Sequence, residues 1–208
     1  MIQRNCILKK ILPLFSYIFH PIFVPIFGAL CYLIFNGNYF SVTQNYILLL
    51  QIVIITFFLP MSFFYLLRTF GAVDSIMLSD IHQRKIPLLM QMALTVVLLT
   101  KSVTIERFPE LFFFFVGGFV STFFTFSLLF IKVKASIHMI GISALTFFVC
   151  GLSIHNQVNT IYTIAFLFLI MGFVATSRLY MNAHTMKELI IGVVIGSLPQ
   201  IVLWIFWL

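Results

Sequence analysis

A guanidinium, an imidazole and a carboxylate lie close together in one polar stretch near the carboxyl end of the chain. Arg178 follows Ser177, His184 comes six residues later, and Glu188 comes four residues after that. Positions 184 and 188 share one face of a helix, so the carboxylate can hold one ring nitrogen of the imidazole. A helix that begins beside His184 disfavours the imidazolium and attracts an anion. With the planar donor fork of arginine, these groups suit the binding of a phosphate.

Glu188 also has a purely structural interpretation. The spacing Thr185-x-x-Glu188 matches a capping box, in which the carboxylate satisfies a backbone N–H at the start of a helix. Support of His184 and capping of the helix both remain open from the sequence.

Two other polar clusters precede long apolar runs. The first is Asp80-Ile81-His82-Gln83-Arg84-Lys85-Ile86-Pro87, in which Pro87 suits a first helical turn and Asp80 can pair with Arg84 one turn later. The second is Lys134-Ala135-Ser136-Ile137-His138. Taken alone, each is typical of a charged loop at a membrane surface.

The three clusters together resemble the signatures of the type 2 phosphatidic acid phosphatase superfamily. The spacing from Ser177-Arg178 through His184 to Glu188 is similar to the third signature, with Glu in place of Asp. Ala135-Ser136-Ile137-His138 resembles the upstream Pro-Ser-Gly-His signature, with Ile137 where the family has Gly. Arg84-Lys85-Ile86-Pro87 resembles the end of the first signature. The resemblance covers roughly residues 80–196, within a phosphatase-like core of roughly residues 68–208.

This resemblance implies a membrane hydrolase that cleaves a lipid-linked phosphate or diphosphate through a phosphohistidine. Substrates of the phosphatidate, phosphatidylglycerophosphate or isoprenyl diphosphate type are implied, with no metal or other cofactor. His184 would attack phosphorus, Glu188 would hold its other ring nitrogen, and His138 would protonate the leaving oxygen. The residues implied in binding the phosphate are Arg178, Arg84, Lys85, Ser136 and Ser177.

Two other classes of function are compatible with parts of the sequence. A catalytically inactive relative that binds phospholipid headgroups, or scaffolds a membrane complex, is indicated by Ile137 and by the altered first signature. A transporter is disfavoured because almost no ionisable residue lies near the middle of the apolar runs, with His20 as the exception. Since His20 precedes Pro21, a kinked helix is its simpler interpretation.

The composition places nearly the whole chain in a membrane. Of its 208 residues, 62% are hydrophobic and 8% are charged, and the mean hydropathy is +1.15. The 12 basic and 5 acidic residues are too few to cover a water-soluble domain. No basic stripe of the kind that nucleic-acid binding needs is visible in the sequence, so nucleic acid is not expected as a partner.

We predict an all-α, polytopic transmembrane bundle of six to seven spans that forms a single domain over residues 1–208. A span needs roughly 20 apolar residues. The third run, residues 86–100, is short for a span, so the number of spans depends on whether it crosses the membrane. In the fourth run, the nine phenylalanines from Phe112 to Phe130 are expected to face lipid. In the last run, Gly192-x-x-x-Gly196 is expected to let two helices approach closely. The runs are 13–35, 45–67, 86–100, 109–131, 136–154, 159–180 and 186–208.

Seven spans place the amino terminus and all three polar clusters on one face. That face then holds ten basic residues and the other holds two, Lys101 and Arg107, which makes the first face cytoplasmic. We therefore expect a bacterial inner-membrane type of protein with its site at the cytoplasmic surface, acting on a lipid phosphate among membrane phospholipids. The oligomeric state is left open. The ten are Arg4, Lys9, Lys10, Arg68, Arg84, Lys85, Lys132, Lys134, Arg178 and Lys187.

Overall fold

The computed structural model describes residues 12–36, 41–71 and 82–208, and within these ranges all regular secondary structure is helical. Six helical segments in these ranges are long and apolar enough to cross a membrane. The chain is therefore an all-α integral membrane protein, as predicted. The six segments are Leu12–Asn36, Val42–Thr69, Pro109–Leu128, Ile137–His155, Ile161–Tyr180 and Met186–Phe206.

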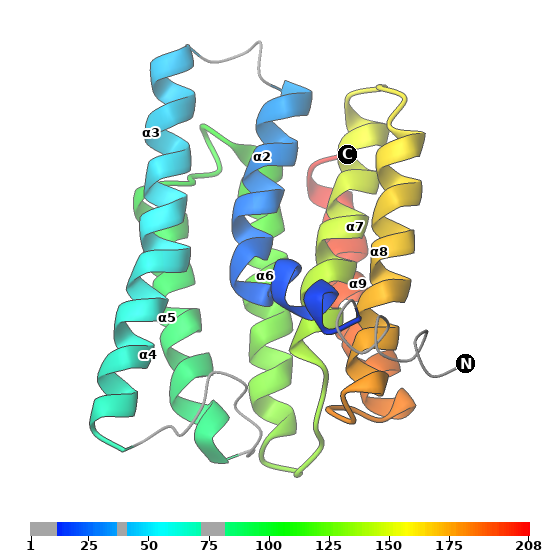
Figure 1. Ribbon diagram of the computed structural model, residues 1–208. Helices are drawn as coiled ribbons and strands as arrows, with labels where there is room; N and C mark the ends of the chain where they lie inside the picture. Colours follow the sequence, from blue (N-terminus) through cyan, green and yellow to red (C-terminus); the bar gives the residue numbers. More distant parts are fainter. Residues whose placement is uncertain (1–11, 37–40, 72–81) are drawn as a thin grey trace.

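The third apolar run of the sequence forms α5 (Lys85–Lys101), a helix of 17 residues that is shorter than these six segments. It nevertheless lies along the bundle beside α6 (Pro109–Leu128) and runs antiparallel to it (Figure 1). Helix directions alternate along the chain with α5 included. Arg84, which precedes α5, therefore lies at the same end of the bundle as the polar residues that precede α7 (Ile137–His155) and α9 (Met186–Leu203).

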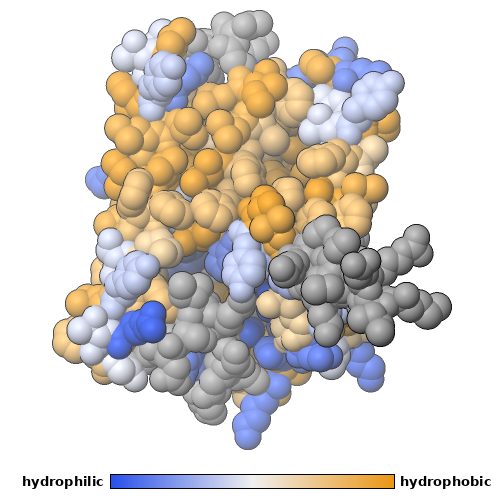
Figure 2. Space-filling view, viewed as in Figure 1, coloured by the Kyte–Doolittle hydropathy of each residue, from blue (hydrophilic) through white to orange (hydrophobic). Residues whose placement is uncertain are grey.

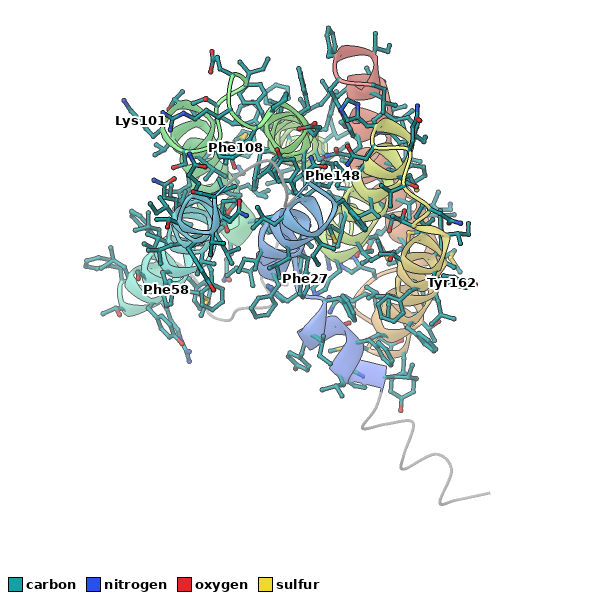
Figure 3. The ribbon with its side chains drawn as sticks, turned by 90° about the horizontal axis from the view of Figure 1, so that it is seen from above. Phe27, Phe58, Lys101, Phe108, Phe148 and Tyr162 are labelled. Atoms are coloured by element: carbon teal, nitrogen blue, oxygen red, sulfur yellow. The ribbon has the colours of Figure 1, made fainter. Side chains whose placement is uncertain are left out.

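The first apolar segment is broken at His20, as the His20-Pro21 pair predicts. Residues 12–18 are helical, and after a turn the chain continues through η1 (Pro21–Phe23) into α2 (Val24–Asn36). His20 caps the new helix, since its Nδ1 accepts from the backbone N–H of Ile22 at 3.3 Å. The short helix of residues 12–18 lies across the bundle instead of extending α2 (Figures 1 and 3).

The second segment changes its winding halfway along. It consists of α3 (Val42–Val53), the π-helical turn η2 (Ile54–Phe58) and α4 (Leu59–Thr69). In η2 the hydroxyl of Thr56 donates to the carbonyl oxygen of Ile52 at 2.8 Å. Isolated π-helical turns are rare and often lie beside functional sites.

Helices α7 and α9 approach each other closely because α9 carries two glycines on the shared face. A Cβ added at Gly192 would lie 2.7 Å from the carbonyl oxygen of Ser136, and one added at Gly196 would overlap the carbonyl oxygen of Ile140. The expected close approach at the Gly192-x-x-x-Gly196 motif is confirmed. It places α7, of which 67% is buried, at the centre of the bundle.

We predict that Gly196→Ala lowers the stability of the protein by roughly 1–3 kcal/mol, because the added methyl group meets backbone that cannot move aside. Gly172→Ala in α8 (Ile161–Tyr180) is the matched control, since a Cβ there meets nothing within 4 Å. Thermal unfolding in detergent measures both variants. Equal stability of the two would contradict the close contact at Gly196.

The outer surface carries a broad apolar band with polar residues towards both ends (Figure 2). In α6, Phe123 and Phe124 are 52% and 51% exposed and contribute to such a surface. The expectation that all phenylalanines of this region face lipid is wrong for Phe114 and Phe115, which are 4% and 5% exposed. Their side chains pack inside the bundle, where hydropathy alone cannot distinguish them from lipid-facing residues.

Candidate functional site

A cavity of about 520 Å³ opens among the helices and is lined by residues from the first segment to the start of the last one. It brings together the three polar clusters of the sequence, which are separated by about 50 residues from one to the next. The ionisable side chains that line it include His20, Arg84, His138, Arg178 and His184. The arginine and the two histidines on which the functional hypothesis depends therefore share one cavity.

His184 is held by the carboxylate of Glu188. Its Nδ1 lies 2.7 Å from Oε2 of Glu188, and the same oxygen accepts the backbone N–H of Thr185 at 3.3 Å. The Thr185 hydroxyl completes the capping box by accepting from the Glu188 N–H at 3.4 Å. Support of His184 and capping of α9 are thus both present. Because the carboxylate accepts the Nδ1 proton, the lone pair of the neutral ring lies on Nε2.

Burial lowers the pKa of His184 to about 4, and the positive charges of Arg178 and Lys134 act in the same direction. The Glu188 carboxylate opposes this change. The imidazole is therefore neutral at pH 7, which is the form that can donate an electron pair to phosphorus.

We predict that His184 titrates near pH 4 in the folded protein, and that Glu188→Gln lowers this pKa further because the neighbouring negative charge is lost. A folded-state pKa below the usual value of about 6.5 means that the unfolded chain binds the proton more readily. Stability from this group is therefore complete above about pH 6.5 and is lost as the pH falls towards 4. NMR of histidine-labelled protein measures the pKa, and a value near 6.5 would contradict the buried environment.

Arg178 lies near the end of α8 with only 4% of its surface exposed. No described residue forms a hydrogen bond with its Nε or Nη1 atom. The two ion pairs found in the described ranges are His155–Glu110 and His184–Glu188, so Arg178 belongs to neither. A buried guanidinium with open donors is costly, and an anion in the cavity would offset that cost.

Arg84 supplies a second buried guanidinium at the end of η3 (His82–Arg84), where α5 begins. Burial lowers the pKa of Arg84, the Glu188 carboxylate raises it, and the positive charge of Arg178 lowers it. These interactions place Arg84 within electrostatic reach of both other groups. The cavity therefore has two arginines and a carboxylate-held histidine around it.

His138 at the start of α7 contacts the first segment. Its Nε2 lies 3.1 Å from the carbonyl oxygen of Ser16, and its ring meets the ring of His20 edge to face with 5.1 Å between centroids. Since a carbonyl oxygen only accepts, Nε2 carries a proton and Nδ1 is the nitrogen left for a ligand. The Ser16 hydroxyl also lies 2.7 Å from that of Ser177. Neither Ser16 nor His20 was predicted as part of this site.

Three other residues of the predicted phosphate-binding set do not line the cavity. The ammonium of Lys85 lies 5.6 Å from the centroid of the Phe130 ring, and the Ser177 hydroxyl is engaged with Ser16. Ser136 is fully buried, and its hydroxyl has no partner within the described part of the chain. Its backbone N–H donates to the carbonyl oxygen of Glu188 at 3.2 Å. The predicted partner of Arg84, Asp80, falls outside the described residues.

A second polar cluster lies at the opposite end of the bundle, where α2 ends and α6 begins (Figure 1). Nε2 of His155 is 3.2 Å from Oε1 of Glu110, and the amides of Asn36 and Asn156 are hydrogen-bonded to each other. These contacts tie α2, α6 and α7 together. The His155–Glu110 pair does not line the cavity.

Comparisons of the chain with protein-family models, with curated proteins and with solved structures found no match. Among the residues that the structure describes, no group of three or more metal-ligating side chains comes together.

Proposed function

We propose that the protein is a membrane phosphatase of the phosphatidic acid phosphatase type, which hydrolyses a lipid-linked phosphate or diphosphate. One observation carries this proposal. Arg84, His138, Arg178 and His184, from three distant polar clusters, line a single cavity in which a buried guanidinium has open donors. A phosphate group matches that combination of positive charge, donors and a neutral imidazole.

The proposed reaction has two steps. In the first, Nε2 of His184 forms a bond to phosphorus while the bond from phosphorus to the lipid oxygen breaks. Because Nε2 of His138 donates to Ser16, the proton for the departing oxygen passes through Nδ1 of His138, which takes it from the bound phosphate monoanion. In the second, water attacks the phosphohistidine, gives its proton to His138 and releases inorganic phosphate. Throughout, Arg178 and Arg84 stabilise the charge on the phosphoryl oxygens.

We further propose that the cavity opens at the cytoplasmic surface of a cell membrane of the bacterial inner-membrane type. The excess of basic residues, ten against two, supports this orientation. At that surface an anionic lipid headgroup would reach the cavity from the adjacent leaflet.

The test is an assay of detergent-purified protein with a panel of lipid monophosphates and diphosphates. We expect release of inorganic phosphate and an acid-labile, base-stable phosphoprotein, which is the stability pattern of phosphohistidine. If no substrate of the panel releases phosphate and no phosphoprotein forms, the proposed activity is wrong.

A second candidate is a relative that binds phospholipid headgroups without turnover. Two observations favour it: Ile137 precedes His138 where the resembled family has glycine, and the Nε2 proton of His138 is already donated to Ser16. Saturable headgroup binding without phosphate release would select this function over the enzyme.

A further inference from the structure

The cavity has a second part that the proposed chemistry does not use. Besides the ionisable groups it is lined by side chains of η2, α4, α5 and α6, which form what we term the apolar arm. Arg84 stands just before α5 and Thr95 lies eleven positions further along it, so the lining extends roughly 16 Å along that helix. The arm includes Phe57, Met61, Thr95, Phe115, Gly118 and Thr122.

The hydroxyl groups in the apolar arm offer no free donor to a ligand. Those of Thr56, Thr95 and Thr122 each donate to the carbonyl oxygen four residues earlier, at 2.8 Å in every case. That of Ser121 donates to the carbonyl oxygens of Gly117 and Ile195. The amide of Gln91 is the other polar side chain lining this part. The arm thus differs from the Arg178 end, where open donors remain.

We propose that the apolar arm binds one hydrocarbon chain of a lipid phosphate whose headgroup lies among Arg178, Arg84 and His184. This inference rests on the proposed function for the identity of the headgroup. Opposite chemistry at the two ends of the cavity matches an amphiphile with an anionic head, and the π-helical turn η2 places Thr56 and Phe57 on the wall of the arm.

The volume of the cavity suits a phosphate headgroup with one chain. At about 30 Å³ for each group of the size of water, 520 Å³ holds on the order of 17 such groups. The five heavy atoms of a phosphate leave room for roughly a dozen chain carbons. A second chain would lie outside the cavity, in lipid, so the site takes one acyl or isoprenyl chain of its ligand.

Photo-crosslinking in lipid nanodiscs tests where the chain lies. The probe is an alkyl phosphate with a diazirine near the eighth carbon, and a second probe carries an isoprenyl chain to separate the two sources. We expect Phe57 and Thr122 to take up at least about tenfold more label than their neighbours Phe58 and Phe123, which are exposed on the outer surface. Label mainly on Phe58 and Phe123 would overturn the inference.

Gly118→Leu adds a side chain to the wall of the arm, and the position accommodates it because a Cβ at Gly118 meets nothing within 4 Å. We expect labelling at Phe57 to fall by at least about fivefold in this variant. Thermal stabilisation of the variant by inorganic phosphate is expected to equal that of the wild type. Gly172→Leu, at an equally open position that does not line the cavity, is the control and keeps the label. Unchanged labelling in Gly118→Leu would contradict the inference, and the wild-type labelling pattern decides if that variant does not fold.

The two proposals fail separately. Label in the arm without phosphate release would reject the enzyme and retain the chain-binding site. Phosphate release with label confined to the outer surface would do the reverse.

Discussion

Replacement of His184 by asparagine is expected to reduce phosphate release by about 10³-fold or more. The change removes Nε2, the nitrogen that the contact with Glu188 leaves with a lone pair, and so removes the proposed nucleophile. Asparagine is small enough for the site and keeps a polar group near Glu188. Initial rates with the best substrate of the panel measure the effect, together with the yield of phosphoprotein.

The opposite end of the bundle provides the matched control. His155 also contacts a glutamate, Glu110, but this pair does not line the cavity. His155→Asn is therefore expected to leave the rate per folded molecule within about twofold of the wild type. Equal rates for His184→Asn and His155→Asn would reject His184 as the nucleophile.

Arg178→Met is expected to change stability and binding in opposite directions. Without ligand, the variant loses a buried guanidinium with two unpaired nitrogens, so its melting temperature stays equal or rises. Hydrogen bonds to charged groups contribute about 1.5–3 kcal/mol each. Loss of two such bonds weakens phosphate or vanadate binding by roughly 10²–10⁴-fold.

Ligand-induced shifts of the melting temperature measure both quantities in one experiment. Arg178→Lys is expected to fall between wild type and Arg178→Met, because lysine keeps the charge but loses the planar donor fork. Arg68→Met, at an exposed position at the end of α4, is the control and binds phosphate normally. A destabilised Arg178→Met that still binds phosphate would show that this side chain has a structural role instead.

The membrane class, the spans and the gathering of Arg84, His138, Arg178 and His184 at one cavity were accessible from the sequence. An apolar run of about 20 residues has few structures open to it in a bilayer besides a spanning helix. Two runs lie between each polar cluster and the next, so the chain returns to the same membrane surface at each cluster. The spacing of His184 and Glu188 likewise predicts their contact, because the start of a helix fixes the i,i+4 geometry.

The contributions of Ser16 and His20 could not be predicted, because they depend on how the first segment breaks and turns across the bundle. The same applies to Phe114 and Phe115. In a membrane the lipid and the interior are equally apolar, so hydropathy does not show which face of α6 is buried. For Lys85 the sequence prediction failed in the opposite way. Its charge suits a phosphate, but its ammonium lies over the ring of Phe130 and not in the cavity.

One oxygen of Glu188 receives both the ring of His184 and the backbone N–H that begins α9. The contact that orients the imidazole of His184 therefore shares its carboxylate oxygen with the capping hydrogen bond at the start of α9. Reagents that fray the first turn of that helix would disorient the ring long before the bundle unfolds, so loss of activity would precede loss of helicity in a denaturant titration.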